Sequence, residues 1–338
     1  MIQMKLLVTG GLGFIGSNFI RFMLNEHDNC TIVNVDAKMF GSNAENLKDL
    51  NETDRYSFVH GNIVNSELIP RLIRDVDAVV SFAAETHVDR SIASPDSFMQ
   101  SNVQGVFNIL EALRNHNSEA RFLQISTDEV YGEILDGSFT EESTLRPSSP
   151  YSASKAAGDV FVLAYARTYG LPAMITRCTN NYGPYQFPEK LIPKTILRAM
   201  KSLKIPVYGT GQNVRDWIYV TDHCRAVEQV LWRGVAGEIY NISSGEERTN
   251  LEVAKTILSL LGKDECLIEF VEDRPGHDVR YSLDSSKTKR ELNWHPEQSF
   301  DKGIRKTVTW YLQNERWWRH LVDDKVLHPT PWRLNWQS

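Results

Sequence analysis

The sequence lacks the features that would place the protein in a membrane, on nucleic acid or in an oxidising compartment. Its four cysteines are far apart without a CxxC motif, so neither a zinc site nor a disulfide framework is indicated, and we expect reduced thiols and no metal. There is no apolar run of about 18 residues and no signal segment, so we expect a cytoplasmic protein without a membrane partner. A net charge of -6 with scattered basic residues also argues against nucleic acid as a partner.

What the sequence does have is an alternation of short apolar strands with helical patterns. The expected strands cover residues 4–9, 31–35, 56–60, 78–84, 121–125 and 173–177, and helical patterns cover 66–75, 98–115 and 152–169. This order predicts an α/β fold, a Rossmann-like doubly wound parallel sheet whose ligands bind at the carboxyl ends of the strands. With 338 residues, the chain is long enough for one large or two ordinary domains.

A glycine-rich turn follows the first strand. Gly10, Gly13 and Gly16 stand between that strand and a helical pattern, which is the context of a dinucleotide-binding loop. Glycine lets the backbone approach a pyrophosphate, and the helix N-terminus meets its charge. Asp36 ends the second strand, where a carboxylate binds ribose hydroxyls and repels a 2′-phosphate, so NAD is favoured over NADP. An ordinary strand-to-helix turn and an ordinary strand-end aspartate are the alternatives.

Two pairs of chemically active residues come later in the series. Asp128 and Glu129 follow the fifth expected strand, and Tyr151 and Lys155 share one face of a helix because they are four residues apart. A close ammonium lowers the pKa of a phenol, so we expect Tyr151 to act as a base or acid near neutral pH. A solvated turn and a chance surface pair are the alternative interpretations.

Together these stretches resemble the extended short-chain dehydrogenase/reductase family of nucleotide-sugar enzymes. The resemblance runs from Met4 to about Trp318. The Asp128-Glu129 pair is its most specific element, because sugar epimerases of that family have small or hydroxyl residues there. The stretches that carry the resemblance are Gly10 to Gly16, Asp36, Ser126-Thr-Asp-Glu-Val-Tyr-Gly132, Tyr151-x-x-x-Lys155, Arg177-Cys-Thr-Asn180, Asn180-Asn-Tyr-Gly-Pro-Tyr-Gln-Phe-Pro-Glu-Lys-Leu-Ile-Pro193, Arg215-Asp-Trp-Ile-Tyr-Val-Thr-Asp-His223 and Asp273-Arg-Pro-Gly-His277.

The resemblance implies NAD as the cofactor and assigns residues to its site. Asn62 departs from the family, which usually has Asp there, and the stretch after Asp36, which would contact the ribose, also differs from the family pattern. The implied cofactor residues are Gly10, Gly13, Phe14, Ile15, Gly16, Asp36, Lys38, Asn62, Ile63, Phe82, Ala83, Ala84, Ser101, Tyr151, Lys155 and Asn181.

The same resemblance implies a nucleotide-sugar site in the second half of the chain. Cationic Arg215 and Arg274 suit a diphosphate, because guanidinium presents forked donors to phosphate oxygens, although surface salt bridging is the alternative. Thr86 stands where the dehydratases usually have Ser, and His87 is equally open to a structural interpretation. The implied substrate residues are Thr86, His87, Thr127, Asn180, Lys190, Leu191, Pro206, Val207, Tyr208, Arg215, Asn250, Asp273, Arg274 and His277.

The expected division follows from these assignments. Residues 1–180 would form the NAD-binding Rossmann domain with the catalytic residues, and 181–338 a smaller substrate-binding α/β region, with part of 215–245 returning to the sheet. The tail from Val308 is rich in tryptophan, a pattern more typical of packing than of a cofactor site.

The chemistry that the resemblance implies is a dehydration of the sugar by Thr127, Asp128, Glu129, Tyr151 and Lys155. Tyr151 takes the proton of the 4-hydroxyl during oxidation at C4, Glu129 removes the C5 proton, and Asp128 protonates the departing 6-hydroxyl. The product, a 4-keto-6-deoxy sugar, belongs to deoxysugar biosynthesis, such as that of rhamnose. A 4-epimerase or decarboxylase would not need Asp128, and a non-catalytic NAD(H)-sensing protein is the alternative from another class.

A homodimer is expected from two helical segments, 98–115 and 152–169, which pair across a two-fold axis in the resembled family. The apolar positions expected to give these helices a second face to bury are Val106, Ile109, Leu110, Leu113, Val160, Phe161 and Ala164.

Overall fold

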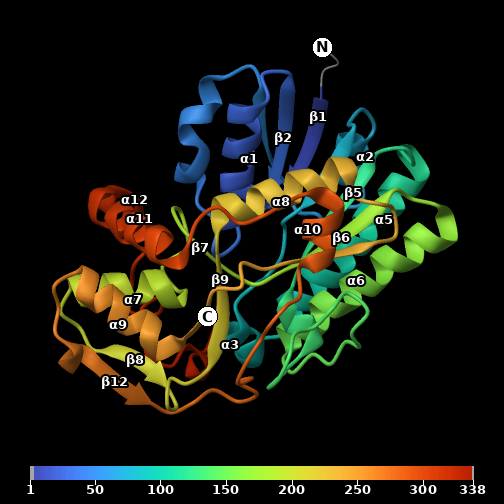
Figure 1. Ribbon diagram of the computed structural model, residues 1–338. Coiled ribbons are helices and arrows are strands. Elements are labelled where there is room, and N and C mark those ends of the chain that lie inside the picture. Colours follow the sequence, from blue (N-terminus) through green and yellow to red (C-terminus); the bar gives the residue numbers. More distant parts are fainter. Residues whose placement is uncertain (1–3, 337–338) are drawn as a thin grey trace.

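The computed structural model describes residues 4–336, which build a Rossmann-like α/β core and a second, smaller region beside it (Figure 1). The core sheet has seven parallel strands, which confirms the predicted fold class. In spatial order the strands are β10 (Ile239–Ile242), β6 (Ala173–Cys178), β5 (Arg121–Thr127), β4 (Ala78–Ser81), β1 (Met4–Thr9), β2 (Cys30–Asp36) and β3 (Tyr56–His60).

Alternate residues of each strand point to opposite faces of this sheet, and helices cover both faces, so both are buried. In β1, Leu6 and Val8 pack on one side and Leu7 on the other. The first side is covered by α1 (Phe14–Glu26), α8 (Val220–Arg233) and α10 (Ser286–Leu292). The second side is covered by α2 (Leu68–Ile73), α5 (Gly105–His116) and α6 (Pro150–Tyr169).

The helical pattern at 98–115 is not one regular helix. It consists of α4 (Asp96–Met99), the wide π turn η2 (Gln100–Gln104) and α5. The turn contains Asn102, which is buried, accepts a hydrogen bond from the Glu85 N–H at 2.9 Å and donates to the Glu85 carbonyl and to Ser154 Oγ. Asn102 thus ties the loop after β4 to α6, the helix that carries Tyr151 and Lys155.

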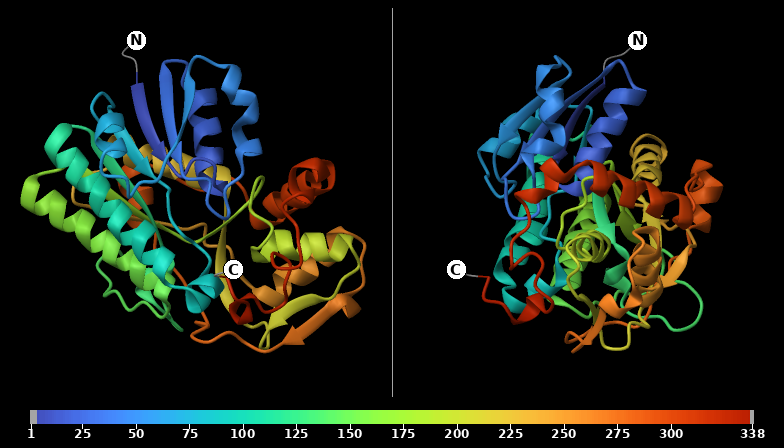
Figure 2. Two further views of the ribbon diagram at one scale, coloured as in Figure 1. Left: turned by 180° about the vertical axis from the view of Figure 1, so that it is seen from behind. Right: turned by 90° about the vertical axis from the view of Figure 1, so that its left-hand side faces the viewer.

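The second region lies beside the core sheet (Figure 2). It has two small sheets and its own hydrophobic core. Trp317 and Trp318 are buried in that core, in line with the packing role expected for the tryptophan-rich tail. Its strands are β7 (Asn180–Tyr182), β9 (Val214–Tyr219) and β11 (Glu247–Thr249) in one sheet, and β8 (Ile205–Tyr208) and β12 (Ile268–Val271) in the other. Its helices are α7 (Leu191–Met200), α9 (Asn250–Leu260), η4 (Glu265–Leu267), α11 (Phe300–Gln313), α12 (Glu315–Arg319) and η5 (Pro331–Arg333).

Three further helical segments lie around the core sheet: η1 (Ala44–Glu52), α3 (Val88–Ala93) and η3 (Asp128–Tyr131). All four cysteines are free thiols. Within residues 4–336 there is no cluster of three or more histidine, cysteine or acidic side chains that could hold a metal ion, and no helix that is both long and apolar enough to cross a membrane.

Candidate active site

The glycine turn after β1 has the geometry that a bound pyrophosphate needs. Gly10 has a φ of +70°, and a Cβ there would lie 2.5 Å from the Ala83 nitrogen. A Cβ on Gly16 would lie 2.6 Å from the Gly10 carbonyl oxygen. Gly13 is the N-cap of α1 and has no side chain to occupy the first-turn N–H groups, which are left to face an anion. The turn therefore fits a dinucleotide.

Asp36 lies at the end of β2 with its carboxylate fixed beside that turn. Its Oδ2 accepts from the Leu12 N–H at 3.0 Å and its Oδ1 from the Lys38 N–H at 2.7 Å. Burial raises the pKa of Asp36, and these two backbone hydrogen bonds oppose that rise. The Lys38 side chain is directed elsewhere, with its ammonium 5.0 Å from the centre of the Phe58 ring.

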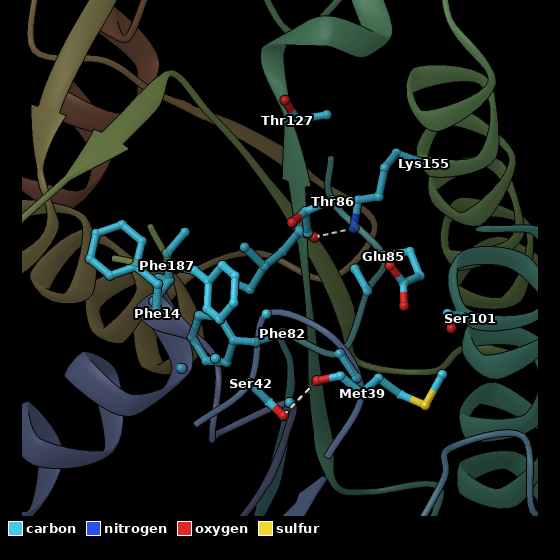
Figure 3. Close-up of a pocket in the computed structure, with 18 of the residues that line it drawn as sticks. Phe14, Met39, Ser42, Phe82, Glu85, Thr86, Ser101, Thr127, Lys155 and Phe187 are labelled. Atoms are coloured by element: carbon cyan, nitrogen blue, oxygen red, sulfur yellow. Dashed lines mark hydrogen bonds between the residues drawn. The ribbon is translucent and has the colours of Figure 1, made fainter. Parts of the chain in front are cut away.

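A cavity of about 310 Å³ extends from this turn along the carboxyl ends of the strands. All the predicted cofactor residues line this cavity except Lys38, which lies outside the lining that the described residues form. Figure 3 shows the rings of Phe14, Phe82 and Phe187 on one side of the cavity and Lys155 and Ser101 on the other. Asn62 also lines it, with Oδ1 accepting from the Val64 N–H at 3.1 Å.

The two reactive pairs meet at the end of this cavity. Thr127, the last residue of β5, is the N-cap of η3 and accepts from the Glu129 N–H, which turns Asp128 and Glu129 into the wall. Lys155 is fixed by a hydrogen bond of 2.5 Å from Nζ to the Ile125 carbonyl. Tyr151 lines the same cavity from α6. The structure thus brings all five predicted catalytic residues to one place.

The two carboxyl groups of this pair have different environments. Burial, followed by the charge of Glu129, raises the pKa of Asp128 to about 8. The Oδ2 atom of Asp128 is buried and has no hydrogen-bond partner within residues 4–336. Burial also raises the pKa of Glu129, but the charges of Arg274 and Arg215 oppose that rise. Asp128 therefore carries a proton near neutral pH, while the cations favour the ionised form of Glu129.

The expected effect of Lys155 on Tyr151 is wrong in this structure. Burial, and after it the charge of Glu129, raises the pKa of Tyr151 well above its usual value. Lys155 is buried too, and burial lowers its own pKa. The spacing of four did place both residues on one side of α6, but sequence spacing does not reveal burial.

A second cavity, of about 180 Å³, lies between α3 and the second region. Thr86, Glu129, Asn180, Glu189 and Lys190 line both cavities, so the two adjoin. The predicted substrate residues line one or the other, except Asp273, which is outside the described lining and is hydrogen-bonded to His277 at 2.6 Å.

The wall of the second cavity contains Lys190, Lys194, Arg215 and Arg274, together with three acidic side chains. Arg274 donates from NH1 to Asp89 at 2.8 Å, while its Nε is buried without a hydrogen-bond partner in residues 4–336. Arg215 is held by the carbonyls of Val214 and Asp278 at 2.7 and 2.9 Å. His87 is buried, which lowers its pKa well below the usual value, so it is neutral. An anionic diphosphate suits this wall.

Several residues that line the cavities are absent from the sequence predictions. Phe40 and Phe187 line the cofactor cavity with their rings 5.0 Å apart, and Glu189 lies between the two cavities. Asp89 and Lys194 line the second cavity. Asp89 lies two residues after the predicted His87, and this closeness is a usable signal, whereas nothing in the sequence pattern marks Lys194.

The comparisons with known proteins agree with this geometry. The family model described as GDP-mannose 4,6 dehydratase matches residues 7–307. The chain belongs to this family. It is 48% identical to a dTDP-glucose 4,6-dehydratase of Neisseria meningitidis, over 94% of this chain and 96% of that protein. It is 51% identical to the low-salt glycan biosynthesis protein Agl12 of Haloferax volcanii, over 92% of this chain and 100% of that one.

Solved structures of the family have the same fold. The crystal structure of a dTDP-glucose 4,6-dehydratase from Streptomyces venezuelae, solved with NAD bound, has a TM-score of 0.92 and 48% identity, covering 94% of this chain and 100% of that one. These likenesses confirm the family resemblance that the sequence motifs indicate.

Proposed function

We propose that this protein is an NAD-dependent dTDP-glucose 4,6-dehydratase, which converts dTDP-glucose to dTDP-4-keto-6-deoxyglucose and water. The observation that carries the proposal is the Asp128-Glu129 pair. Asp128 is protonated near neutral pH, and Glu129 borders both the cofactor cavity and the substrate cavity. An acid beside a base at that junction suits the elimination of water. The relatives with this activity support it over most of the chain.

The residues of the first cavity would hold NAD, with the pyrophosphate at the glycine turn and the ribose hydroxyls at Asp36. When bound, NAD supplies a reversible oxidation by taking a hydride from the sugar and returning it. Tyr151 accepts the proton of the 4-hydroxyl, Glu129 removes the C5 proton, and Asp128 gives its proton to the departing 6-hydroxyl. C5 is protonated again when the hydride returns to C6. Thr127 hydrogen-bonds the 4-oxygen, and Lys155 holds the ribose of the nicotinamide.

A panel of nucleotide sugars tests the proposal. Incubation with dTDP-, UDP- and GDP-glucose should yield, for dTDP-glucose, a product lighter by one water, with no net accumulation of reduced cofactor. An epimerase would leave the substrate mass unchanged, and a decarboxylase would not act on glucose. If the protein retains NAD but changes none of the sugars, the NAD(H)-sensing interpretation replaces the proposal.

Cofactor selection follows from the charge of Asp36. A 2′-phosphate would meet this carboxylate, so we expect NAD+ to bind on the order of 10²-fold more tightly than NADP+. Titration calorimetry of both cofactors measures the ratio. The ratio should fall for Asp36→Asn and stay unchanged for Asp75→Asn, a change at an exposed position away from the cavity. Equal binding of both cofactors by the unchanged protein would remove Asp36 from the site.

The division of the chain and its cellular setting are part of the proposal. We propose an NAD-binding domain at 1–180 and a substrate-binding region at 181–338. Part of 215–245 belongs to the first domain, which is supported by the packing of α8 against α1 and the pairing of β10 with β6. Free thiols in residues 4–336 support a cytoplasmic location. The product would serve deoxysugar synthesis, that of rhamnose included.

A homodimer formed through α5 and α6 is also proposed. One sequence expectation about its surface is wrong: Val106, Ile109, Leu110 and Leu113 are at most 1% exposed, because they pack against the protein's own sheet. The other three expected positions are on α6 and are exposed: Val160 and Phe161 are 56% and 37% exposed, and Ala164 is exposed as well. The ring of Phe161 extends the face to Phe107 of α5, at 5.9 Å.

Light scattering at low protein concentration should therefore give twice the mass of one chain. Phe161→Asp places a charge in the centre of the apolar face and should shift the mass towards that of the monomer. Val235→Asp, at a position 60% exposed on the loop after α8, is the matched control and should leave the dimer intact. A monomer for the unchanged protein would rule the dimer out.

A further inference from the structure

The segment 326–336, here called the C-terminal strap, runs back from α12 to α3 (Figure 2). It lies beyond residue 307, where the match to the family model ends. Two cations of α7 hold its beginning: Arg198 donates to the Leu327 carbonyl at 2.5 Å, and Lys194 donates to the His328 carbonyl at 3.2 Å. Lys194 is also part of the wall of the substrate cavity. The strap is therefore attached to the outside of that cavity.

The far end of the strap is anchored as well. The indole N–H of Trp336 donates to the Pro331 carbonyl at 2.9 Å, which closes the strap on itself. The Trp336 ring lies 5.5 Å from the ring of Phe40, and the Arg90 guanidinium stacks over both. With both ends held, the residues between them have a fixed position.

Trp332 lies between these anchors and contacts the substrate cavity from outside. Its ring meets the ring of Tyr208 edge-on, at 4.8 Å and 79°. Tyr208 donates to Asp89 Oδ2 at 3.1 Å, and Arg274 donates to Asp89 Oδ1 at 2.8 Å. Tyr208, Asp89 and Arg274 all line the cavity, whereas Trp332 is not in the described lining. One indole thus fixes a hydrogen-bonded chain that ends at Arg274, whose Nε has no hydrogen-bond partner among the described residues.

We propose that Trp332 is a positioning residue for the nucleoside diphosphate part of the substrate. It holds Tyr208, and through Asp89 it holds Arg274 in the orientation that binds a diphosphate. The proposal rests on the proposed function, since it deepens the role of the same site. Trp332 lies outside the described lining of both cavities, and Arg215 and Lys190 as well as Arg274 oppose the rise in the pKa of Glu129, so a shift of Arg274 acts mainly on binding.

The test compares Trp332→Ala with the unchanged protein, using dTDP-glucose for kinetics and dTDP alone for calorimetry. The KM and the Kd for dTDP should rise about three- to tenfold, the contribution of one aromatic pair, while kcat stays within about twofold. Trp332→Phe retains an aromatic ring and should restore most of the affinity. Trp232→Ala is the matched control, because Trp232 packs against the α1 side of the core sheet and should leave the KM unchanged.

Several outcomes would overturn the proposal. An unchanged KM and Kd in a folded Trp332→Ala protein would do so, as would a fall in kcat at constant KM. If the alanine variant does not fold, Trp332→Leu decides, because it keeps apolar volume but removes the ring, and it should show the raised KM. Absence of turnover by the unchanged protein would count against the proposed function, while the dTDP calorimetry would still test Trp332.

Discussion

Replacing Glu129 with glutamine should lower product formation by about 10²- to 10⁴-fold, the usual contribution of a general base. Glutamine has the shape of glutamate but cannot take the C5 proton, while oxidation at C4 does not need that base. Reduced nicotinamide should therefore accumulate on the enzyme after substrate is added. Its near-ultraviolet absorbance, followed by rapid mixing, measures this directly. The location of Glu129 at the junction of the two cavities is the basis for this expectation.

Asp128→Asn provides the comparison that separates the two carboxyl groups. It should also slow the loss of water, because the proton that Asp128 holds up to a pH of about 8 is missing. Exchange of the C5 hydrogen with deuterated solvent should persist in this variant, since Glu129 is intact, and should be lost in Glu129→Gln. Glu142→Gln, at an exposed position, is the control. Product formation by Glu129→Gln at the unmutated rate would show that Glu129 is not the base.

Tyr151→Phe should stop the reaction one step earlier. Without the phenol the 4-hydroxyl has no acceptor for its proton, so we expect a loss of about 10²- to 10⁴-fold in rate and no reduced nicotinamide. Glu129→Gln and Tyr151→Phe should therefore differ in the absorbance of reduced nicotinamide, although both should form little product. Tyr169→Phe, on the exposed end of α6, is the matched control and should be unaffected.

The raised pKa of Tyr151 adds a condition to this role. Because burial and Glu129 keep the phenol protonated, Lys155 alone does not make it a base in this structure. A further positive charge near Tyr151 would lower the pKa of its phenol, and the oxidised nicotinamide ring of NAD carries such a charge. Appearance of reduced nicotinamide in Tyr151→Phe at the unmutated rate would assign the proton to another group.

The core of the fold could be predicted from the sequence because the patterns that indicate it are local. Each strand of the sheet is a short apolar run, and Gly10, Gly16 and Asp36 stand at fixed distances from such runs. The reactive pair at Asp128 and Glu129 was found for the same reason, since it directly follows β5. These features need only neighbouring residues to be recognised.

The rest depended on contacts between distant parts of the chain. Tyr208 and Arg274 meet at Asp89 across 119 and 185 residues, so no local pattern joins them. The π turn at Asn102 is set by its hydrogen bonds to Glu85 and Ser154, and periodicity alone predicted a regular helix. Burial of Tyr151 is likewise a property of the whole fold, which is why its pKa was predicted in the wrong direction.

The most direct test of the account uses dTDP-glucose labelled with deuterium at C4. If one active site oxidises C4, eliminates water and returns the same hydride, the product carries the label at C6, as mass spectrometry of its fragments can show. The account predicts a 4-keto-6-deoxy product with deuterium at C6 and no lasting reduction of the cofactor. Label that remains at C4 of an epimerised sugar, or that stays on released cofactor, would contradict it.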